Sequence, residues 1–293
     1  MQIAFLLTQT SLLLLTHETN SLQTVDPMAV NKPLQSALHV QQLSWTVAEH
    51  RILKNIDLSV TQGDSVAFIG PNGAGKTSLL KCIAGLQQGY QGKIFLQNES
   101  LEALSTRQVA QRIAFVSQHQ DTPFDLTVND IVRMGLLANK PLLAFDDIND
   151  DEKIADALHL VGLKHKRWDS FKTLSGGEQQ RILIARSVIQ SPNVLIMDEP
   201  TNHLDIYYQH QILSLAKKLD LTLIFSIHNL ELASQYADTL VLIDQGQIVE
   251  QGNADTVLTA ERLERVFKLP CQVEPHPTNP GKRVTFFSGG TGR

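Results

Sequence analysis

The stretch FIGPNGAGKTSLLKCIAG, residues 68–85, runs from an apolar strand through a glycine-rich turn into a helix. Within it, Gly70 to Thr77 match the pattern G-x-x-x-x-G-K-[ST] at every required position. Glycines let such a turn point successive backbone N–H groups inward as an anion nest, and the helix start adds a partial positive charge. The sequence therefore predicts a loop that holds the phosphates of a nucleoside triphosphate.

Each position of this loop and of the first helical turn is a candidate contact. The predicted nucleotide-binding residues are Gly70, Pro71, Asn72, Gly73, Ala74, Gly75, Lys76, Thr77 and Ser78. Lys76 can reach the β- and γ-phosphates, Thr77 can place its hydroxyl on Mg²⁺, and Ser78 would add a hydroxyl nearby. The alternative is a tight turn with an exposed lysine, which the complete match in a strand–loop–helix context disfavours.

A second apolar run, VLIMDE at residues 194–199, ends in two acids. Its four apolar residues predict a buried strand, at whose end Asp198 can hold the Mg²⁺ shell. Glu199 is then placed to polarise an attacking water as a general base. By itself the pattern could be a strand end with a helix cap; combined with the phosphate loop it indicates a hydrolytic site.

The stretch TLSGGEQQR, residues 173–181, places Ser175, Gly176 and Gly177 just ahead of a predicted helix. Their N–H groups and the serine hydroxyl form a second anion-binding helix start. One triphosphate does not need two such cradles, so the pair favours a chain that dimerises head to tail, each copy closing the other's nucleotide site. A plain helix cap would account for these residues, but not for the motifs that accompany them.

The composition of the 293 residues is that of an ordinary globular protein, with 42% hydrophobic and 19% charged residues. The formal net charge is −5, and no basic stripe interleaved with aromatics is present, which argues against nucleic acid as a partner. Cys82 and Cys271 lie far apart without metal-ligand spacing, a usage typical of a reduced, cytosolic compartment.

One membrane-like stretch, IAFLLTQTSLLLL at residues 3–15, lies near the N-terminus. It is too short to span a hydrocarbon core of about 30 Å, and it lacks the basic start and cleavage site of a signal peptide. We expect a packed or loose N-terminal extension; Met28 is an alternative start of synthesis.

From Leu38 onward, short strand-like segments alternate with helical ones, which predicts an α/β fold with a mostly parallel sheet. A strand is expected in RIAFVSQ, ending at Gln118, and a hairpin turn at Gly246. Thr127, with an acid three residues on, is typical of a capping box at a helix start. Further helices, the last one ended by Pro192, predict a helical insertion over roughly residues 125–188.

Together these motifs resemble the nucleotide-binding subunit of ABC transporters over nearly all of residues 38–270. LSGGEQQ resembles the signature of that family, GPNGAGKT its Walker A motif and VLIMDE its Walker B motif. The resemblance implies a P-loop NTPase with a mixed, mostly parallel core sheet, an antiparallel β subdomain and a helical subdomain. The expected domains are an N-terminal extension (1–37), an ABC ATPase domain (38–270, with its helical subdomain at about 125–188) and a C-terminal tail (271–293).

Three further roles follow from the resemblance. Gln118 matches the family's Q-loop glutamine, which touches Mg²⁺ and relays to the membrane subunit, and Asp205 in TNHLD matches the D-loop. His228, at the end of LTLIFSIH, matches the switch histidine that contacts the γ-phosphate. The catalytic candidates are therefore Glu199 and His228. Gln118, Ser175, Gly176, Gly177 and Asp205 join the phosphate loop as nucleotide-binding residues, and Thr77, Gln118 and Asp198 are the metal candidates.

The sequence departs from the family pattern at two places. Val47 occupies the position where many members stack adenine on an aromatic ring. Trp45, two residues earlier on the same predicted strand, either substitutes for that ring or belongs to the core. Asn229 follows the switch histidine where many relatives carry aspartate.

EPTNHLDIYYQ, with LSGGEQQRILIAR, resembles the importer branch that takes up ferric siderophores, haem and cobalamin, and its wording is most similar to the ferric-siderophore members. This resemblance implies an ATPase that uses ATP and Mg²⁺ and pairs head to tail with a second, identical subunit. It also implies multi-span permease subunits, indirectly a substrate-binding protein, and a peripheral place on the cytoplasmic face of the inner membrane.

Other functions fit the sequence less well. A haem or cobalamin importer ATPase is the nearest alternative. A soluble ABC-type ATPase of translation or DNA repair would bring a second cassette or long heptads, neither of which the sequence contains. A P-loop kinase would lack LSGGE and the strand that ends in histidine, and an exporter half would carry its own membrane helices.

Overall fold

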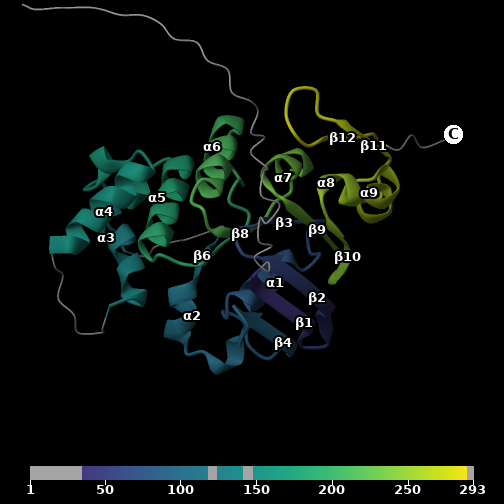
Figure 1. The fold of residues 1–293 in the computed structure, drawn as a ribbon. Helices are drawn as coiled ribbons and strands as arrows, with labels where there is room; N and C mark the ends of the chain where they lie inside the picture. Colours follow the sequence, from purple (N-terminus) through teal and green to yellow (C-terminus); the bar gives the residue numbers. More distant parts are fainter. Residues whose placement is uncertain (1–34, 118–123, 141–147, 289–293) are drawn as a thin grey trace, which may run out of the picture. The chain divides into compact units, whose positions relative to one another are not determined.

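The computed structural model describes residues 35–117, 124–140 and 148–288, all within the unit Leu34–Arg293 (Figure 1). Most of the expected N-terminal extension 1–37 and the last residues of the expected tail 271–293 lie outside these ranges. The predicted nucleotide and metal contact Gln118 also lies outside them.

A six-stranded sheet organises this unit, in the order β10-β9-β3-β8-β7-β6. Its strands are β3 (Ser65–Ile69), β6 (Ile113–Val116), β7 (Val194–Met197), β8 (Thr222–Ser226), β9 (Thr239–Asp244) and β10 (Gln247–Gly252). Neighbours from β9 to β6 pair in parallel, and β10 adds an antiparallel edge. The mixed, mostly parallel sheet and the hairpin turn at Gly246 are therefore confirmed, although β6 ends two residues before Gln118.

A separate four-stranded sheet, ordered β2-β1-β4-β5, confirms the antiparallel β subdomain. It consists of β1 (Ser36–Val47), β2 (His50–Thr61), β4 (Gln91–Leu96) and the short β5 (Glu99–Ser100). Its inner face carries apolar residues such as Val40, Leu43 and Ile94, which are fully buried.

Two hydrophobic clusters lie on opposite faces of the parallel sheet. Val66 and Phe68 of β3 belong to the cluster that contains the antiparallel sheet and helix α1 (Lys76–Ile83). Ala67 and Ile69, which point the other way, belong to the cluster that contains most other helices. Burial on both faces explains why this strand reads as an uninterrupted apolar run.

The second cluster holds the helical part of the unit. Its helices are α3 (Val128–Arg133), α4 (Ile148–Leu160), α5 (Gly176–Ile189), α6 (Ile206–Lys217), α7 (Leu230–Tyr236), α8 (Ala254–Val257) and α9 (Ala260–Phe267). In Figure 1, α3, α4 and α5 form a group beside the sheet. Thr127 begins α3 with a complete capping box to Asp130, as its spacing predicted.

Two elements had weaker sequence signals. Helix α2 (Thr106–Arg112) leads into β6 and begins with a capping box between Ser105 and Gln108. Beyond residue 270 the chain forms an antiparallel hairpin, β11 (Cys271–Pro275) and β12 (Lys282–Phe286), which packs against α7 and α9.

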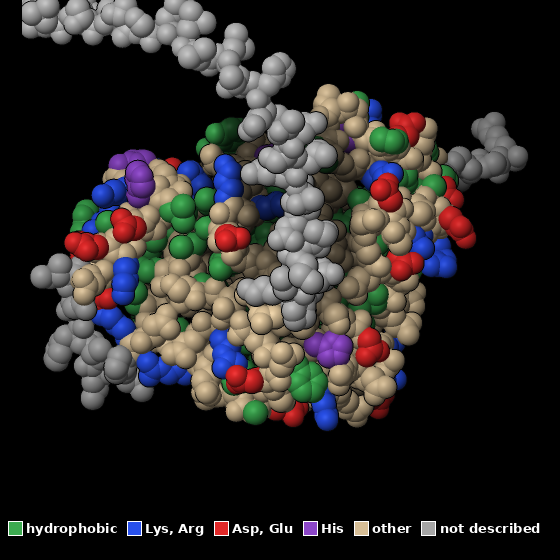
Figure 2. Space-filling view, in the orientation of Figure 1, with side chains coloured by type: hydrophobic (Ala, Val, Ile, Leu, Met, Phe, Trp, Pro, Cys, Tyr) green, Lys and Arg blue, Asp and Glu red, His purple; other side chains and the backbone are tan. Residues whose placement is uncertain are grey.

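The surface of the described residues carries charges of both signs. Figure 2 shows lysine and arginine side chains interspersed with aspartate and glutamate over the face in view, outside the part that grey atoms cover. Within the described ranges, no helix is long and apolar enough to cross a membrane.

A glycine turn joins the two sheets and generates a stability prediction. Gly246, between β9 and β10, has φ +79°, and a Cβ added there would lie 2.1 Å from the carbonyl oxygen of Ile52 on β2. Gly63 has a similar φ of +85°, but open space around it. We expect Gly63→Ala to lower the free energy of unfolding by about 1 kcal/mol through backbone strain alone.

Gly246→Ala should lower the same free energy by about 1–3 kcal/mol more, because its methyl group also collides with backbone. Urea unfolding of both variants, compared with the unaltered chain, measures the difference. Equal losses in the two variants would mean that the close approach at Gly246 does not contribute to stability.

Candidate functional site

The predicted phosphate loop connects the end of β3 to the start of α1, as the sequence pattern required. Gly70 has φ +143°, and a Cβ there would lie 2.0 Å from the carbonyl oxygen of Ile243 on β9. Gly75 has φ +104°, and a Cβ added there would lie 3.0 Å from Cδ2 of the Leu53 side chain. These two positions need glycine both for their backbone angles and for close packing.

Lys76 lies beneath this loop with 5% of its surface exposed. Its Nζ donates hydrogen bonds to the carbonyl oxygens of Gly70 at 2.8 Å and Pro71 at 3.0 Å. Burial lowers the pKa of the Lys76 ammonium, while the nearby carboxylates of Glu199 and Asp198 raise it. The loop lysine and the two strand-end acids therefore belong to one electrostatic site.

Asp198, 4% exposed at the end of β7, accepts two hydroxyl hydrogen bonds on the same oxygen, Oδ1. Thr77 Oγ1 donates at 3.0 Å and Ser226 Oγ at 2.7 Å. A threonine hydroxyl beside a carboxylate fits Mg²⁺, which takes few protein ligands and completes its shell with phosphates and water. Among the described residues, no group of three or more His, Cys, Asp or Glu side chains could hold a metal ion by itself.

Ser226 is a site residue that sequence reasoning missed. Ser226 is fully buried at the end of β8. Besides donating to Asp198, its Oγ accepts the backbone N–H of Glu199 at 2.8 Å. One hydroxyl therefore fixes both the Asp198 carboxylate and the backbone of its neighbour. The available signal was a polar residue inside the apolar run LTLIFSIH, directly before Ile227 and His228.

The Glu199 carboxylate is held from two sides. His228 Nε2 lies 2.7 Å from its Oε1, and Asn202 Nδ2 donates to its Oε2. The backbone of Glu199 has φ +50°, a left-handed conformation that is uncommon outside glycine and that clusters at functional sites. The predicted base and the predicted switch histidine are thus in direct contact.

Asn229, the residue that departs from the family pattern, caps helix α7. Its Oδ1 accepts backbone N–H groups of Glu231 at 2.9 Å and Leu232 at 3.0 Å. Asparagine and aspartate are equally good helix caps. Asn229 therefore caps α7 as well as the aspartate of many relatives would.

Ser175 begins α5 with a capping box. Its N–H donates to Glu178 Oε2 at 2.9 Å, and Glu178 Oε1 lies 2.7 Å from Lys166 Nζ. Hydrogen bonds from Lys166 and then from the Ser175 backbone lower the pKa of the Glu178 carboxyl to about 2. A Cβ on Gly177 would lie 2.8 Å from the Tyr208 ring, so this glycine lets α6 approach α5 closely.

The structure brings together Lys76, Thr77, Asp198, Glu199 and His228, but it does not bring Ser175–Gly177 to them. No hydrogen bond between described residues links this second helix start to the phosphate loop. Helix α5 packs in the cluster on one face of the sheet and α1 in the cluster on the other, and Figure 1 shows them apart.

The other predicted contacts are placed as follows. Asp205 is exposed and caps α6, where its Oδ1 accepts the N–H of Tyr208 at 3.2 Å. Trp45 is half-buried against the core cluster below the antiparallel sheet, whereas Val47 is 47% exposed.

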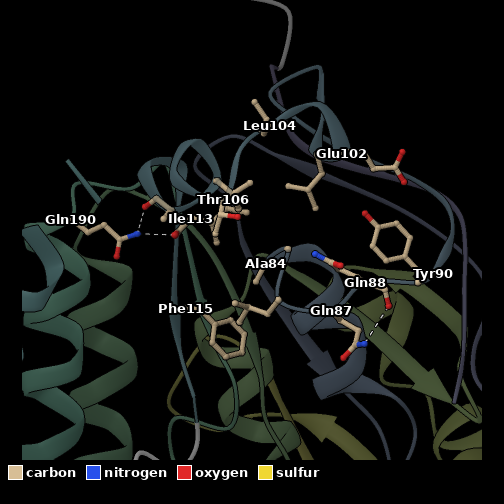
Figure 3. A pocket seen from close by; sticks show the side chains of 16 residues that line it. Ala84, Gln87, Gln88, Tyr90, Glu102, Leu104, Thr106, Ile113, Phe115 and Gln190 are labelled. Atoms are coloured by element: carbon tan, nitrogen blue, oxygen red, sulfur yellow. Dashed lines mark hydrogen bonds between the residues drawn. The ribbon is translucent and has the colours of Figure 1, made fainter. Parts of the chain in front are cut away.

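A separate cavity of about 500 Å³ lies at the end of α1 away from the phosphate loop (Figure 3). Leu86 and Tyr90 line it from the segment that follows α1, Phe115 from β6 and Gln190 from the end of α5. Gln190 Nε2 donates to the carbonyl oxygen of Ile113 at 2.7 Å, which joins the helical part to the edge of the sheet.

Comparisons with known proteins give matches over most of the chain. The family model described as ABC transporter matches residues 53–202. The ferric enterobactin transport ATP-binding protein of Escherichia coli (strain K12) is 33% identical over 244 residues, 82% of this chain and 90% of that protein. The hemin import ATP-binding protein of Hydrogenovibrio crunogenus (strain DSM 25203 / XCL-2) is 34% identical over 241 residues, 78% of this chain and 92% of that protein.

A solved structure gives the same result for the fold. An ABC transporter of metal-chelate type, in an inward-facing conformation, matches with a TM-score of 0.76 at 28% sequence identity. The match covers 87% of this chain and 98% of the solved chain.

The position of Ser226 generates a prediction for ATP turnover. Ser226→Ala removes the hydroxyl that orients Asp198 and accepts the Glu199 N–H, without touching the phosphate loop. We expect kcat to fall about 10- to 100-fold, as is usual when support for a catalytic ligand is removed, while the Kd for ATP changes little. Steady-state ATP hydrolysis and nucleotide binding by fluorescence measure the two quantities.

Ser187→Ala is the matched control, because Ser187 is equally buried but its hydroxyl bonds only to Leu183 within α5. Its kcat should equal that of the unaltered chain. A kcat for Ser226→Ala within twofold of that control would contradict the role given to Ser226.

Proposed function

The chain belongs to the ATP-binding subunits of ABC transporters, and from this premise we propose that it hydrolyses ATP to power import of an iron chelate, a ferric siderophore, through a membrane permease. One observation supports ATP hydrolysis: the candidate residues converge where three neighbouring parallel strands end and α1 begins. These residues are Lys76, Thr77, Asp198, Glu199 and His228. The proposed cargo is inferred from the similarity to the ferric enterobactin and hemin ATP-binding proteins.

Glu199 is the proposed general base. Its carboxylate, fixed by His228 and Asn202, would take a proton from the water that attacks the γ-phosphate. Lys76 would neutralise charge on the β- and γ-phosphates, and His228 would contact the γ-phosphate from its place beside Glu199. Thr77 and Asp198 would hold Mg²⁺, which when bound neutralises phosphate oxygens.

The functional unit is proposed to be a head-to-tail homodimer. Ser175, Gly176 and Gly177 of one copy would close the nucleotide held by the phosphate loop of the other. Two features support this arrangement: each chain carries two anion-binding helix starts, and within one chain they lie on opposite faces of the sheet. Asp205, exposed at the start of α6, would lie at the same junction.

Permease subunits are the proposed membrane partners, with a substrate-binding protein acting through them at a distance. The cavity of Figure 3 supports a contact near α1 and β6, because Leu86, one of its lining residues, is 60% exposed and apolar. Gln190 also ties this region to the helical part, where Asn139 Nδ2 donates to its carbonyl oxygen at 2.8 Å. The chain would then sit peripherally on the cytoplasmic face of the inner membrane.

Haem is the second candidate cargo. The hemin import relative is 34% identical to this chain and the ferric enterobactin relative 33%, so the two resemblances are of equal strength. The sequence TNHLDI at residues 201–206 favours a ferric siderophore over haem as the cargo.

Uptake measurements test the proposal. In cells whose only copy carries Glu199→Gln, we expect uptake of labelled ferric siderophore to fall about 100-fold, because the isosteric amide keeps the size and shape of the side chain but does not accept the proton. Uptake of labelled haem and cobalamin in the same cells should remain normal. Glu261→Gln, the same chemical change at an exposed acid on α9, is the control and should leave all three unchanged.

Each outcome has a separate meaning. Loss of haem uptake alone would replace the siderophore by haem. Normal uptake of all three cargoes in the Glu199→Gln cells would contradict the import function for iron chelates.

A further inference from the structure

The β11–β12 hairpin packs against the short helix that follows the switch histidine. Helix α7 has seven residues and begins one residue after its cap, Asn229, which directly follows His228. A helix of two turns has little stability of its own, so its direction is set by its tertiary contacts. Whatever fixes α7 therefore also fixes the backbone that carries the His228 imidazole.

Two backbone groups of β12 bond to side chains of α7. The Lys282 N–H donates to Ser234 Oγ at 2.9 Å, and the Val284 N–H donates to Glu231 Oε1 at 3.3 Å. These bonds run along one face of α7, while its other face, including Leu232 and Ala233, is buried in the core cluster. Helix α7 therefore packs against the core cluster on one face and hydrogen-bonds to β12 on the other.

Gly281 allows this contact. It has φ +126°, and a Cβ there would lie 2.7 Å from Ser234 Oγ and 3.2 Å from the Ser234 carbonyl carbon. Any larger residue would strain its own backbone and push the hairpin away from α7.

The far side of the hairpin is anchored on α9. The Cys271 N–H donates to Glu264 Oε1 at 3.0 Å, and the rings of Phe267 and Phe286 lie 5.4 Å apart. In Figure 1 the hairpin, in yellow, lies next to both α7 and α9. It therefore connects an element remote from the chemistry to the helix beside it.

The turn of the hairpin also approaches the site. His276 and Pro280 line a cavity of about 210 Å³ together with Asn229 and with Ile206, the first residue of α6. Asn229 follows His228, and Ile206 follows Asp205. The hairpin turn thus shares this cavity with the starts of α6 and α7, which directly follow Asp205 and the His228–Asn229 pair.

We propose that the C-terminal hairpin is a positioning element for His228: through Gly281 and Ser234 it holds α7 so that the imidazole stays in hydrogen-bond contact with Glu199. This inference rests on the proposed role of His228 in hydrolysis. Among the described residues, the hydrogen bonds of the hairpin go to α7, α9 and the hairpin itself or its base, and not to the phosphate loop, so we expect its effect on the catalytic step and not on ATP binding.

The test introduces a methyl group between hairpin and helix. Gly281→Ala should lower kcat for ATP about tenfold and leave the Kd for ATP unchanged. Its second readout is the ring signal of His228 in an NMR spectrum of the histidines, assigned as the signal missing in His228→Ala. That signal should shift in Gly281→Ala.

Lys282→Ala is the matched control on the same strand. It removes an ion pair between the Lys282 ammonium, on a side chain that is 21% exposed, and the 78% exposed Asp255, but keeps the backbone bond to Ser234. Exposed pairs of this kind contribute little to stability. Both kcat and the His228 signal should stay as in the unaltered chain.

Ser234→Ala is the second variant, because it removes the hydroxyl while favouring the helix, and it should reproduce both effects even if Gly281→Ala unfolds. Combined with His228→Ala, neither change should lower kcat further, whereas a merely structural role would give additive losses. If His228→Ala slows hydrolysis but both variants leave kcat and the His228 signal unchanged, the inference is wrong and the proposed function stands. Unchanged hydrolysis in His228→Ala would overturn both.

Discussion

The parallel pairing of β3, β8 and β7 is the constraint on which the rest of the structure depends. Phe68 pairs with Ser226 and Phe225 with Met197, so the three strands end at one edge of the sheet. The phosphate loop, the two acids and the switch histidine all follow these strand ends. Because side chains alternate along a strand, a slip of one residue would exchange the two faces and turn Asp198 away from Thr77.

The Ser226 hydroxyl holds this register at the site itself. It donates to the Asp198 carboxylate and accepts the N–H of Glu199, and thereby joins β8 to the end of β7 by side chain as well as by backbone. A neutral hydroxyl suits this buried position, because a second carboxylate there would repel Asp198 and a methyl would leave its oxygen with one donor fewer. The histidine two residues later can then meet Glu199 because both strands are fixed.

Local patterns predicted the mostly parallel α/β core, the phosphate loop, the acids at a strand end and the Thr127 capping box, because each is encoded within a few residues. The antiparallel subdomain and the role of His228 were expected from the family resemblance. Long-range contacts were beyond such patterns. Nothing near Gly246 in the sequence indicates that Ile52 approaches it, and nothing near Gly281 indicates Ser234. The role of Ser226 likewise depends on which strands become neighbours, and a single polar residue in an apolar run does not reveal that.

In the proposed dimer, the packing of α1 and α5 on opposite faces of one sheet would give ATP a mechanical role. A ligand shifts an equilibrium between open and closed copies only as far as it binds the closed state more tightly, and a nucleotide held between two chains does so. Cleavage of the γ-phosphate removes part of that preference. The helical part, joined to the sheet edge through Gln190, would be the segment that transmits the change in the proposed transporter.

The most direct test of this account is a cross-linking measurement between copies in the Glu199→Gln background. One chain carries Asn72→Cys in the phosphate loop and the other Ser175→Cys; the natural Cys82 and Cys271 are buried. With a short bismaleimide, we expect a mixed, cross-linked dimer that forms with ATP and not without nucleotide. A yield of that product that does not depend on ATP, or its absence in both conditions, would contradict a nucleotide site shared between two copies.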